Sequence, residues 1–164
     1  MRLVSYTIYL IGVLLIVGSA TPPKKILVTE PYSEEELLRY SNGQHTITGQ
    51  AFMRQRGGGV VTCAGAEVTI VPLTKFAEKI LQVRLSGNTP QYSTQEQVAG
   101  GGRSRSYIQK AICDAQGNFI FNKVSKGRWF FETKVSWRVG DSYQGGYVRK
   151  KVKITGDQRV ILSN

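Results

Sequence analysis

The sequence contains a single histidine, His45, among 164 residues. A zinc site of the peptidase type needs two or three protein ligands, usually including two histidines. A Ser-His-Asp triad would have to use His45, and no nucleophile-elbow motif accompanies it. A polar turn residue beside Gly43 is the simpler interpretation of His45. We therefore expect a protein that is not an enzyme and has no catalytic residues.

Phosphate-binding loops are missing as well. The glycine triplets at 57–59 and 100–102 are not followed by Lys-Ser or Lys-Thr, which a phosphate loop requires. We expect both triplets to form turns or flexible tips. Carboxylates cluster only at 34–36, where capping of a helix explains them. We expect neither a metal ion nor a cofactor.

The first 20 residues are typical of a targeting segment. A positive Arg2 precedes an apolar stretch at 6–17, and three small residues at 18–20 form a plausible cleavage site. The alternative is an uncleaved N-terminal anchor, because the uncharged stretch is near the shortest length that spans a bilayer. No cysteine lies near the end of the segment, which argues against a bacterial lipoprotein. Both interpretations place the rest of the chain outside the cytoplasm, in the periplasm or secreted, with the membrane contacted only through this segment.

Cysteine is scarce, but its number is even. Cys63 and Cys113 are the two cysteines of an exported chain, and paired cysteines in an oxidising compartment favour a disulfide. Closing a loop of this length would contribute about 4 kcal/mol to stability in the chain-entropy model. Two free, buried thiols are the alternative.

Acidic residues are few relative to basic ones. The net charge is +11, and residues 103–164 hold 13 Lys and Arg against four acidic residues. Such an excess favours anionic surroundings, for example lipid headgroups, polyanionic glycans or an acidic protein partner. Solvated charge that keeps the protein soluble is the alternative. We expect an envelope protein partner or an anionic surface, and no nucleic acid.

A leader at 21–45 is expected to contain one short helix. Ser33 is placed to cap its N-terminus, and Glu36 to complete a capping box. The helix should end near Tyr40, because the Asn-Gly pair at 42–43 favours a left-handed stop.

Strands are expected to dominate after residue 45. The clearest pattern is 129–138, where apolar and polar residues alternate and predict a strand with one buried face, Trp129 pointing inward. Residues 74–85 fit a helix through apolar positions four and seven apart, or a strand. Residues 86–106 are polar and glycine-rich, and predict a loop. A turn is expected at 145–146.

One strand face is the candidate binding surface. Arg149, Lys151 and Lys153 occupy every second position, so they project from the same side of a strand. The opposite side carries Val148, Val152 and Ile154, with Lys150 among them. If that strand neighbours 129–138, Lys134 and Arg138 extend the surface. Such a surface would bind phosphates or carboxylates. A charged solvent face that discourages edge aggregation is the alternative.

A longer pattern resembles a known family. The run Asp114-x-x-Gly117-x-Phe119-x-Phe121-x-x-Val124-x-x-Gly127-x-Trp129, with Ile47–Ala51 and Ala64–Ile70 upstream, resembles carboxypeptidase regulatory-like domains. The resemblance implies an all-β fold: a transthyretin-like, seven-stranded antiparallel β-sandwich at 46–164, here with an insertion at 73–106 that contains the possible helix. It also implies an accessory role, as a non-catalytic structural or interaction module of the cell envelope. A binding protein for anionic glycans or lipid headgroups is the alternative.

Overall fold

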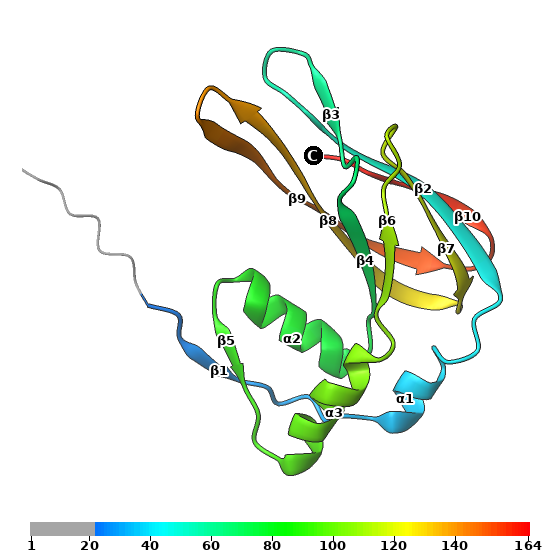
Figure 1. Cartoon of the computed structure of the whole chain (residues 1–164). Coiled ribbons are helices and arrows are strands. Elements are labelled where there is room, and N and C mark those ends of the chain that lie inside the picture. The colour runs from blue at the N-terminus through cyan, green and yellow to red at the C-terminus, as the bar shows by residue number, and fades with distance from the viewer. Residues whose placement is uncertain (1–21) are drawn as a thin grey trace, which may run out of the picture.

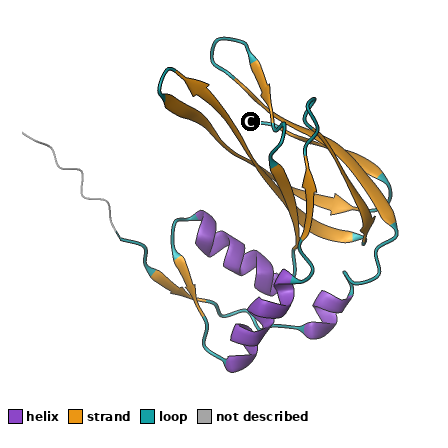
Figure 2. Ribbon diagram, in the orientation of Figure 1, coloured by secondary structure: helices purple, strands orange, loops and turns teal. Residues whose placement is uncertain are grey.

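The computed structural model describes residues 22–164. The targeting segment predicted at 1–20 lies outside the described residues. Within the described range the chain forms a β-sandwich, with all three helices on one side of it (Figures 1 and 2). The sandwich and the helical side each have their own hydrophobic cluster.

One sheet is organised around β2 (His45–Arg54). This strand pairs antiparallel with β3 (Val60–Thr62) and β7 (Asn118–Val124), and parallel with β10 (Gln158–Leu162). With the four strands of the second sheet, the described part of the chain forms a sandwich of eight strands and not the seven expected. The parallel pair also departs from the all-antiparallel arrangement expected from the sequence. It arises because the short connection at 155–157 carries the chain from the other sheet across to the edge of this one.

The second sheet is antiparallel throughout. Its strand order is β6-β4-β8-β9, with β4 (Glu67–Pro72) and β8 (Gly127–Val139) in the middle. The edges are β6 (Gln109–Ile112) and β9 (Ser142–Ile154). Strands β8 and β9 pair along their whole length and form a long hairpin that projects beyond the sandwich (Figure 1).

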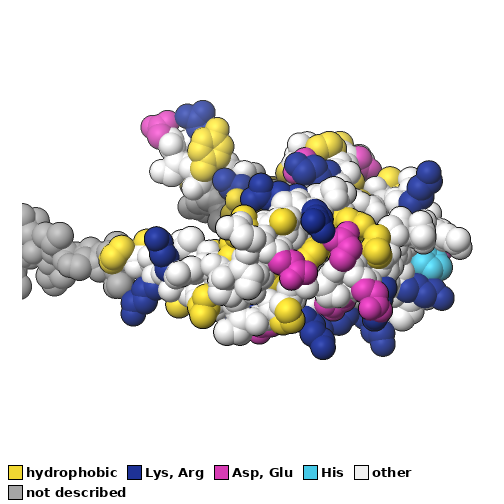
Figure 3. Space-filling view, turned by 90° about the horizontal axis from the view of Figure 1, so that it is seen from below, with side chains coloured by type: hydrophobic (Ala, Val, Ile, Leu, Met, Phe, Trp, Pro, Cys, Tyr) yellow, Lys and Arg dark blue, Asp and Glu magenta, His cyan; other side chains and the backbone are white. Residues whose placement is uncertain are grey.

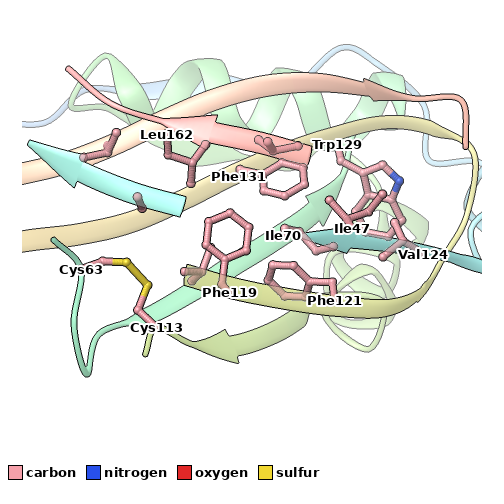
Figure 4. Packing of buried hydrophobic residues seen from close by; sticks show 14 of the residues in the cluster. Ile47, Cys63, Ile70, Cys113, Phe119, Phe121, Val124, Trp129, Phe131 and Leu162 are labelled. Carbon is pink, nitrogen blue, oxygen red and sulfur yellow. A yellow bond between two sulfur atoms is a disulfide. The ribbon is translucent and has the colours of Figure 1, made fainter. Parts of the chain in front are cut away.

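Aromatic side chains fill the space between the two sheets (Figure 4). Trp129 is fully buried and donates its indole N–H to the Ser125 carbonyl at 2.9 Å. The Phe131 ring meets Phe121 edge-on, with the ring centroids 6.1 Å apart. Trp129 therefore faces inward, as the alternating pattern predicts, and its one polar group keeps a partner when buried.

Cys63 and Cys113 form a disulfide at one end of this core, with their Cα atoms 5.8 Å apart (Figure 4). Cys63 follows β3 and Cys113 follows β6, so the bond joins the ends of strands from opposite sheets. The predicted pairing is confirmed.

The helical side combines the leader with the insertion. The leader contributes β1 (Lys25–Leu27) and α1 (Glu34–Leu38). The insertion contributes α2 (Lys75–Leu85), β5 (Thr89–Gln91) and α3 (Gln95–Arg105). β1 pairs parallel with β5, and buried side chains from both segments share one cluster: Val28, Tyr32, Leu37 and Phe76. None of the helices among residues 22–164 is long and apolar enough to cross a membrane.

The helix predicted in the leader is present, with one difference at each end. Ser33 caps α1 by accepting the backbone N–H of Glu36. The Glu36 carboxylate does not complete the box; it accepts the backbone N–H of Lys75, at the start of α2. The predicted left-handed stop is wrong, because Gly43 does not have a positive φ. Gly43 instead passes so close to the backbone that a Cβ atom would lie 2.0 Å from the Lys123 carbonyl oxygen.

Residues 74–85 form a helix rather than a strand. Thr74 caps α2, and Phe76 and Val83 are buried on its inner face. The loop predicted at 86–106 is wrong, since that segment forms β5 and α3. A capping box between Thr94 and Gln97 begins α3. The Gln97 amide then donates to the backbone carbonyls of Val28 and Glu30 in the leader, at 3.0 Å each.

The turn predicted at 145–146 is also wrong. β9 runs through both glycines, and the hairpin turns earlier, between Val139 and Ser142. Gly145 has a φ of +118°, and a Cβ atom there would lie 2.1 Å from the Val135 carbonyl oxygen. Glycine at this position thus permits a close approach of two paired strands rather than a reversal of the chain.

Candidate functional site

The structure places all five predicted cations on one face of the β8–β9 hairpin. Lys134 and Arg138 come from β8, and Arg149, Lys151 and Lys153 come from β9. The pairing register sets Lys134 beside Tyr147 and Arg138 beside Tyr143. With about 3.4 Å of rise per residue, the row of cations extends over roughly 30 Å. The predicted surface is therefore an elongated face and not a compact pocket.

Acidic side chains neutralise part of this face. The Lys151 ammonium lies 2.7 Å from the Glu78 carboxylate of α2, which also binds Arg128 at 2.6 Å. Arg149 binds Glu132 on the neighbouring strand. Figure 3, a view of the helical side, likewise shows acidic side chains among the basic ones. Ion pairs that are partly exposed contribute little to stability, but they remove charge from a binding surface.

The remaining positive charge lies toward the hairpin end. Within residues 22–164, Lys134 has no ion-pair partner, and the ion-pair partner of Arg138 is the exposed Asp141, at 3.1 Å. Lys153 also lacks an ion-pair partner within this range, but it lies at the opposite end of the row. The α2 contact through Glu78 therefore divides the face, and leaves the hairpin end as its open part.

Two tyrosines stand among the cations at this end. Tyr143 is 79% exposed and Tyr147 is 54% exposed. The Arg149 guanidinium lies 4.5 Å from the centroid of the Tyr147 ring, in cation–π contact. The sequence prediction missed both tyrosines, although they continue the alternation of Arg149 and Lys151. The supposed turn at 145–146 concealed that continuity.

Hollows lie on both sides of the hairpin end. One, of about 400 Å³, is lined by Lys134, Ser136, Tyr143, Gln144 and Gly145. The other, of about 460 Å³, lies toward the β2–β3 hairpin and contains Trp137 and two arginines, Arg54 and Arg56. The two hairpins project at the same end of the sandwich (Figure 1). We use the name hairpin-end surface for the two hollows together with Tyr147 and Arg149.

The chemistry of the hairpin-end surface suits binding of an anion with an apolar face. The two hollows are lined by ammonium, guanidinium, hydroxyl, amide and aromatic groups, with no carboxylate, imidazole or thiol. Ammonium and guanidinium groups donate to carboxylate, sulfate or phosphate oxygens. Exposed tyrosine and tryptophan rings offer apolar area together with one polar atom.

His45 lies away from this surface. It is the first residue of β2 rather than a turn residue, and its Nδ1 atom is 3.4 Å from the Asp157 carboxylate. The same carboxylate oxygen accepts the backbone N–H of Thr46 at 2.9 Å. This pair therefore joins the start of β2 to the connection before β10. Among residues 22–164, no group of three His, Cys, Asp or Glu side chains is arranged to hold a metal ion.

Comparisons with known proteins address the fold. No protein-family model matches the chain, and no curated protein matches it in sequence. The crystal structure of "a putative carbohydrate binding protein (PA1324)" from Pseudomonas aeruginosa is similar, with a TM-score of 0.60 and 19% identity over 82% of this chain and 99% of that one. The fimbrial protein FimP from Actinomyces oris aligns with a TM-score of 0.41 and 13% identity, over 75% of this chain and 30% of that one. These comparisons identify no family for the chain, and the predicted resemblance to carboxypeptidase regulatory-like domains stays a prediction. What they show is a β-sandwich protein whose fold is similar to that of PA1324.

Proposed function

We propose that this protein is a non-catalytic binding module of the cell envelope. The observation that carries the proposal is the hairpin-end surface, where Tyr143 and Tyr147 are held exposed on a regular strand beside Lys134 and Arg149. Large aromatic side chains are costly to leave in water, and they are enriched where proteins contact other molecules. The cationic, amide and aromatic side chains that line the two hollows supply the hydrogen-bond donors and the apolar area that a binding surface needs.

The Cys63–Cys113 bond supports a location outside the cytoplasm. Disulfides form and persist in oxidising compartments and are rare where glutathione keeps thiols reduced. The apolar segment predicted to direct export agrees with this location. Within the envelope, a protein partner would approach the projecting hairpins, which no other part of the described chain covers at their tips (Figure 1).

Capture from intact envelopes tests this function. The full chain, cross-linked in place and recovered, should retain one protein in stoichiometric amount. The variant Tyr143→Ser should lose it, whereas Lys153→Gln, at the far end of the same face, should keep it. Equal recovery with both variants would contradict a role for the hairpin end.

A second candidate ligand is an anionic glycan, which the mixture of tyrosines and cations favours. The apolar face of a sugar ring packs on an aromatic ring, while ammonium and guanidinium groups bind its carboxylates or sulfates. The protein with the similar fold is itself described as a putative carbohydrate binding protein. Anionic lipid headgroups share the charge of such a glycan but present no sugar ring to Tyr143.

Binding to three polymers separates these possibilities. Polygalacturonate carries both rings and carboxylates, dextran only the rings, and polyphosphate only the charge. A glycan site predicts that polygalacturonate binds at least ten-fold more tightly than either control, and that Tyr143→Ser removes this preference. Equal affinity for polyphosphate or for anionic vesicles would instead indicate a purely electrostatic surface, with the salt dependence expected of one.

A further inference from the structure

A separate groove lies between α2 and α3, on the helical side of the molecule. Its volume is about 370 Å³, and Val71 of β4 and Ile108, just before β6, contribute to its lining. This volume is at the lower end of the range for small-molecule pockets. Figure 3 views the helical side and shows apolar side chains exposed between the charged ones.

Apolar side chains from both helices line the groove. Ile80 and Leu81 come from α2 and Val98 from α3, with Tyr92 from the segment between the helices. Val98 is 54% exposed. Water in such a groove contacts mostly hydrocarbon, and its release by an apolar ligand is favourable.

The glycines of α3 contribute to the opening. Packing requires glycine at position 100, because a Cβ atom there would collide with the Tyr32 ring. Gly101 and Gly102 line the groove, and packing does not require glycine at either position. A Cβ atom at Gly101 would be in ordinary contact with the phenol group of Tyr92, whose hydroxyl oxygen would be 3.6 Å away, and one at Gly102 would meet nothing within 4 Å. Since glycine weakens a helix, these two positions lower the stability of α3 while they leave the groove free of side chains.

Two cations line the same groove. Arg84 and Arg105 stand in the last turns of α2 and α3. Within residues 22–164 neither forms an ion pair, whereas the adjacent Arg103 binds Glu34 at 2.8 Å. A guanidinium group beside an apolar groove is complementary to a carboxylate attached to an apolar chain.

We propose that this interhelical groove binds a small amphiphilic anion, an alkyl chain that ends in a carboxylate. The hydrocarbon chain lies between α2 and α3 against Val71 and Ile108, and the carboxylate is held by Arg84 and Arg105. The site is distinct from the hairpin-end surface, which lies on the β8–β9 and β2–β3 hairpins, and its ligand is independent of the function proposed above.

Calorimetric titration of the full chain with sodium decanoate, below the concentration at which it forms micelles, tests the proposal. Two matched compounds serve as controls: decyltrimethylammonium has a chain of nearly the same length with a cationic head, and butyrate has the same head with a short chain. We expect decanoate to bind at least ten-fold more tightly than either compound. Equal affinity for decyltrimethylammonium, or no binding of decanoate, would overturn the proposal.

Two variants locate the site. Gly101→Leu places a side chain in the groove and improves helix propensity, so its melting temperature should not fall while decanoate affinity drops at least ten-fold. Ala99→Leu, on the exposed side of α3, is its control. Val98→Asp provides a second block, by charge, if Gly101→Leu does not fold.

A double variant tests the two arginines. Arg84→Gln with Arg105→Gln should lower the affinity for decanoate at least ten-fold, whereas the control double variant, Lys24→Gln with Lys75→Gln, should keep it. Affinity unchanged between either test variant and its control would refute the assigned groove.

Discussion

The aromatic ring of Tyr32 lies against the backbone of Gly100, so closely that a Cβ atom on Gly100 would be 2.2 Å from the Tyr32 Cδ2 atom. Tyr32 belongs to the leader and Gly100 to α3, which are far apart in the sequence. The Phe76 ring of α2 packs edge-on against the same tyrosine, with the centroids 5.7 Å apart. The leader and the insertion therefore form a single packed unit that neither segment could form alone.

Substitution of Gly100 tests this unit. Gly100→Ala should destabilise the protein by about 1–3 kcal/mol, because the added methyl group must displace the buried Tyr32 ring. Gly102→Ala is the control, since a Cβ atom there has open space; it should be neutral or stabilising by up to about 1 kcal/mol. Urea denaturation measures both. Equal stability of the two variants would show that the ring does not constrain α3.

The sandwich core should be far more sensitive than its outer face. Trp129→Ala removes a fully buried indole and leaves a cavity and an unpaired Ser125 carbonyl, at a cost of about 3–5 kcal/mol. Lys153→Ala on the outer face should cost roughly 0.5 kcal/mol or less. Thermal melting compares the two. If both variants melted at similar temperatures, the inward placement of Trp129 would be wrong.

Removal of the disulfide should lower stability by about 2–5 kcal/mol. The comparison is between the native protein and the variant Cys63→Ala with Cys113→Ala, in the same denaturant series. The intact mass of the native chain should also be lower by two hydrogen atoms than the mass of its reduced form. Two alkylatable thiols in the denatured, unreduced protein would contradict the bond.

The contact between α2 and β9 should weaken in acid. The Lys151 ammonium, with help from Arg128 and against the effect of burial, holds the pKa of the Glu78 carboxyl below its usual value of 4.5. Because the folded-state pKa is the lower one, this stabilisation is complete above pH 4.5 and is lost as the pH falls through the folded-state value. Glu78→Gln should therefore reduce stability near neutral pH and flatten its decline in acid. Glu96→Gln, at an exposed position of α3, is the matched control.

Local patterns predicted those parts of the fold that depend on neighbouring residues. The alternation around Trp129 identified β8 and its buried face, and Ser33 identified the start of α1. Helix α3 was missed, although Thr94 and Gln97 form a local capping box, because three consecutive glycines oppose helix formation. Remote contacts add to this cap: Gln97 binds backbone carbonyls of the leader, and Gly100 accommodates Tyr32.

The candidate site was likewise predicted only where it depends on local patterns and not where it depends on remote contacts. The period-two pattern put Arg149, Lys151 and Lys153 on one face correctly, and the pairing of β8 with β9 added Lys134 and Arg138. Glu78, which neutralises Lys151, comes from the insertion, so the residue pattern of the strand could not predict this contact. The tyrosines were missed because a pair of glycines is usually a turn. Here Gly145 instead lets the β9 backbone pass close to the Val135 carbonyl of β8.

The Cys63–Cys113 bond has a consequence for how the chain can be cut. It encloses β4, α2, β5, α3 and β6 in one covalent ring. A single break of the backbone anywhere inside this ring opens it but releases no fragment, since the sulfur bridge still joins the two pieces. The segment from β4 to β6 can therefore be nicked once while every part of the molecule stays covalently joined.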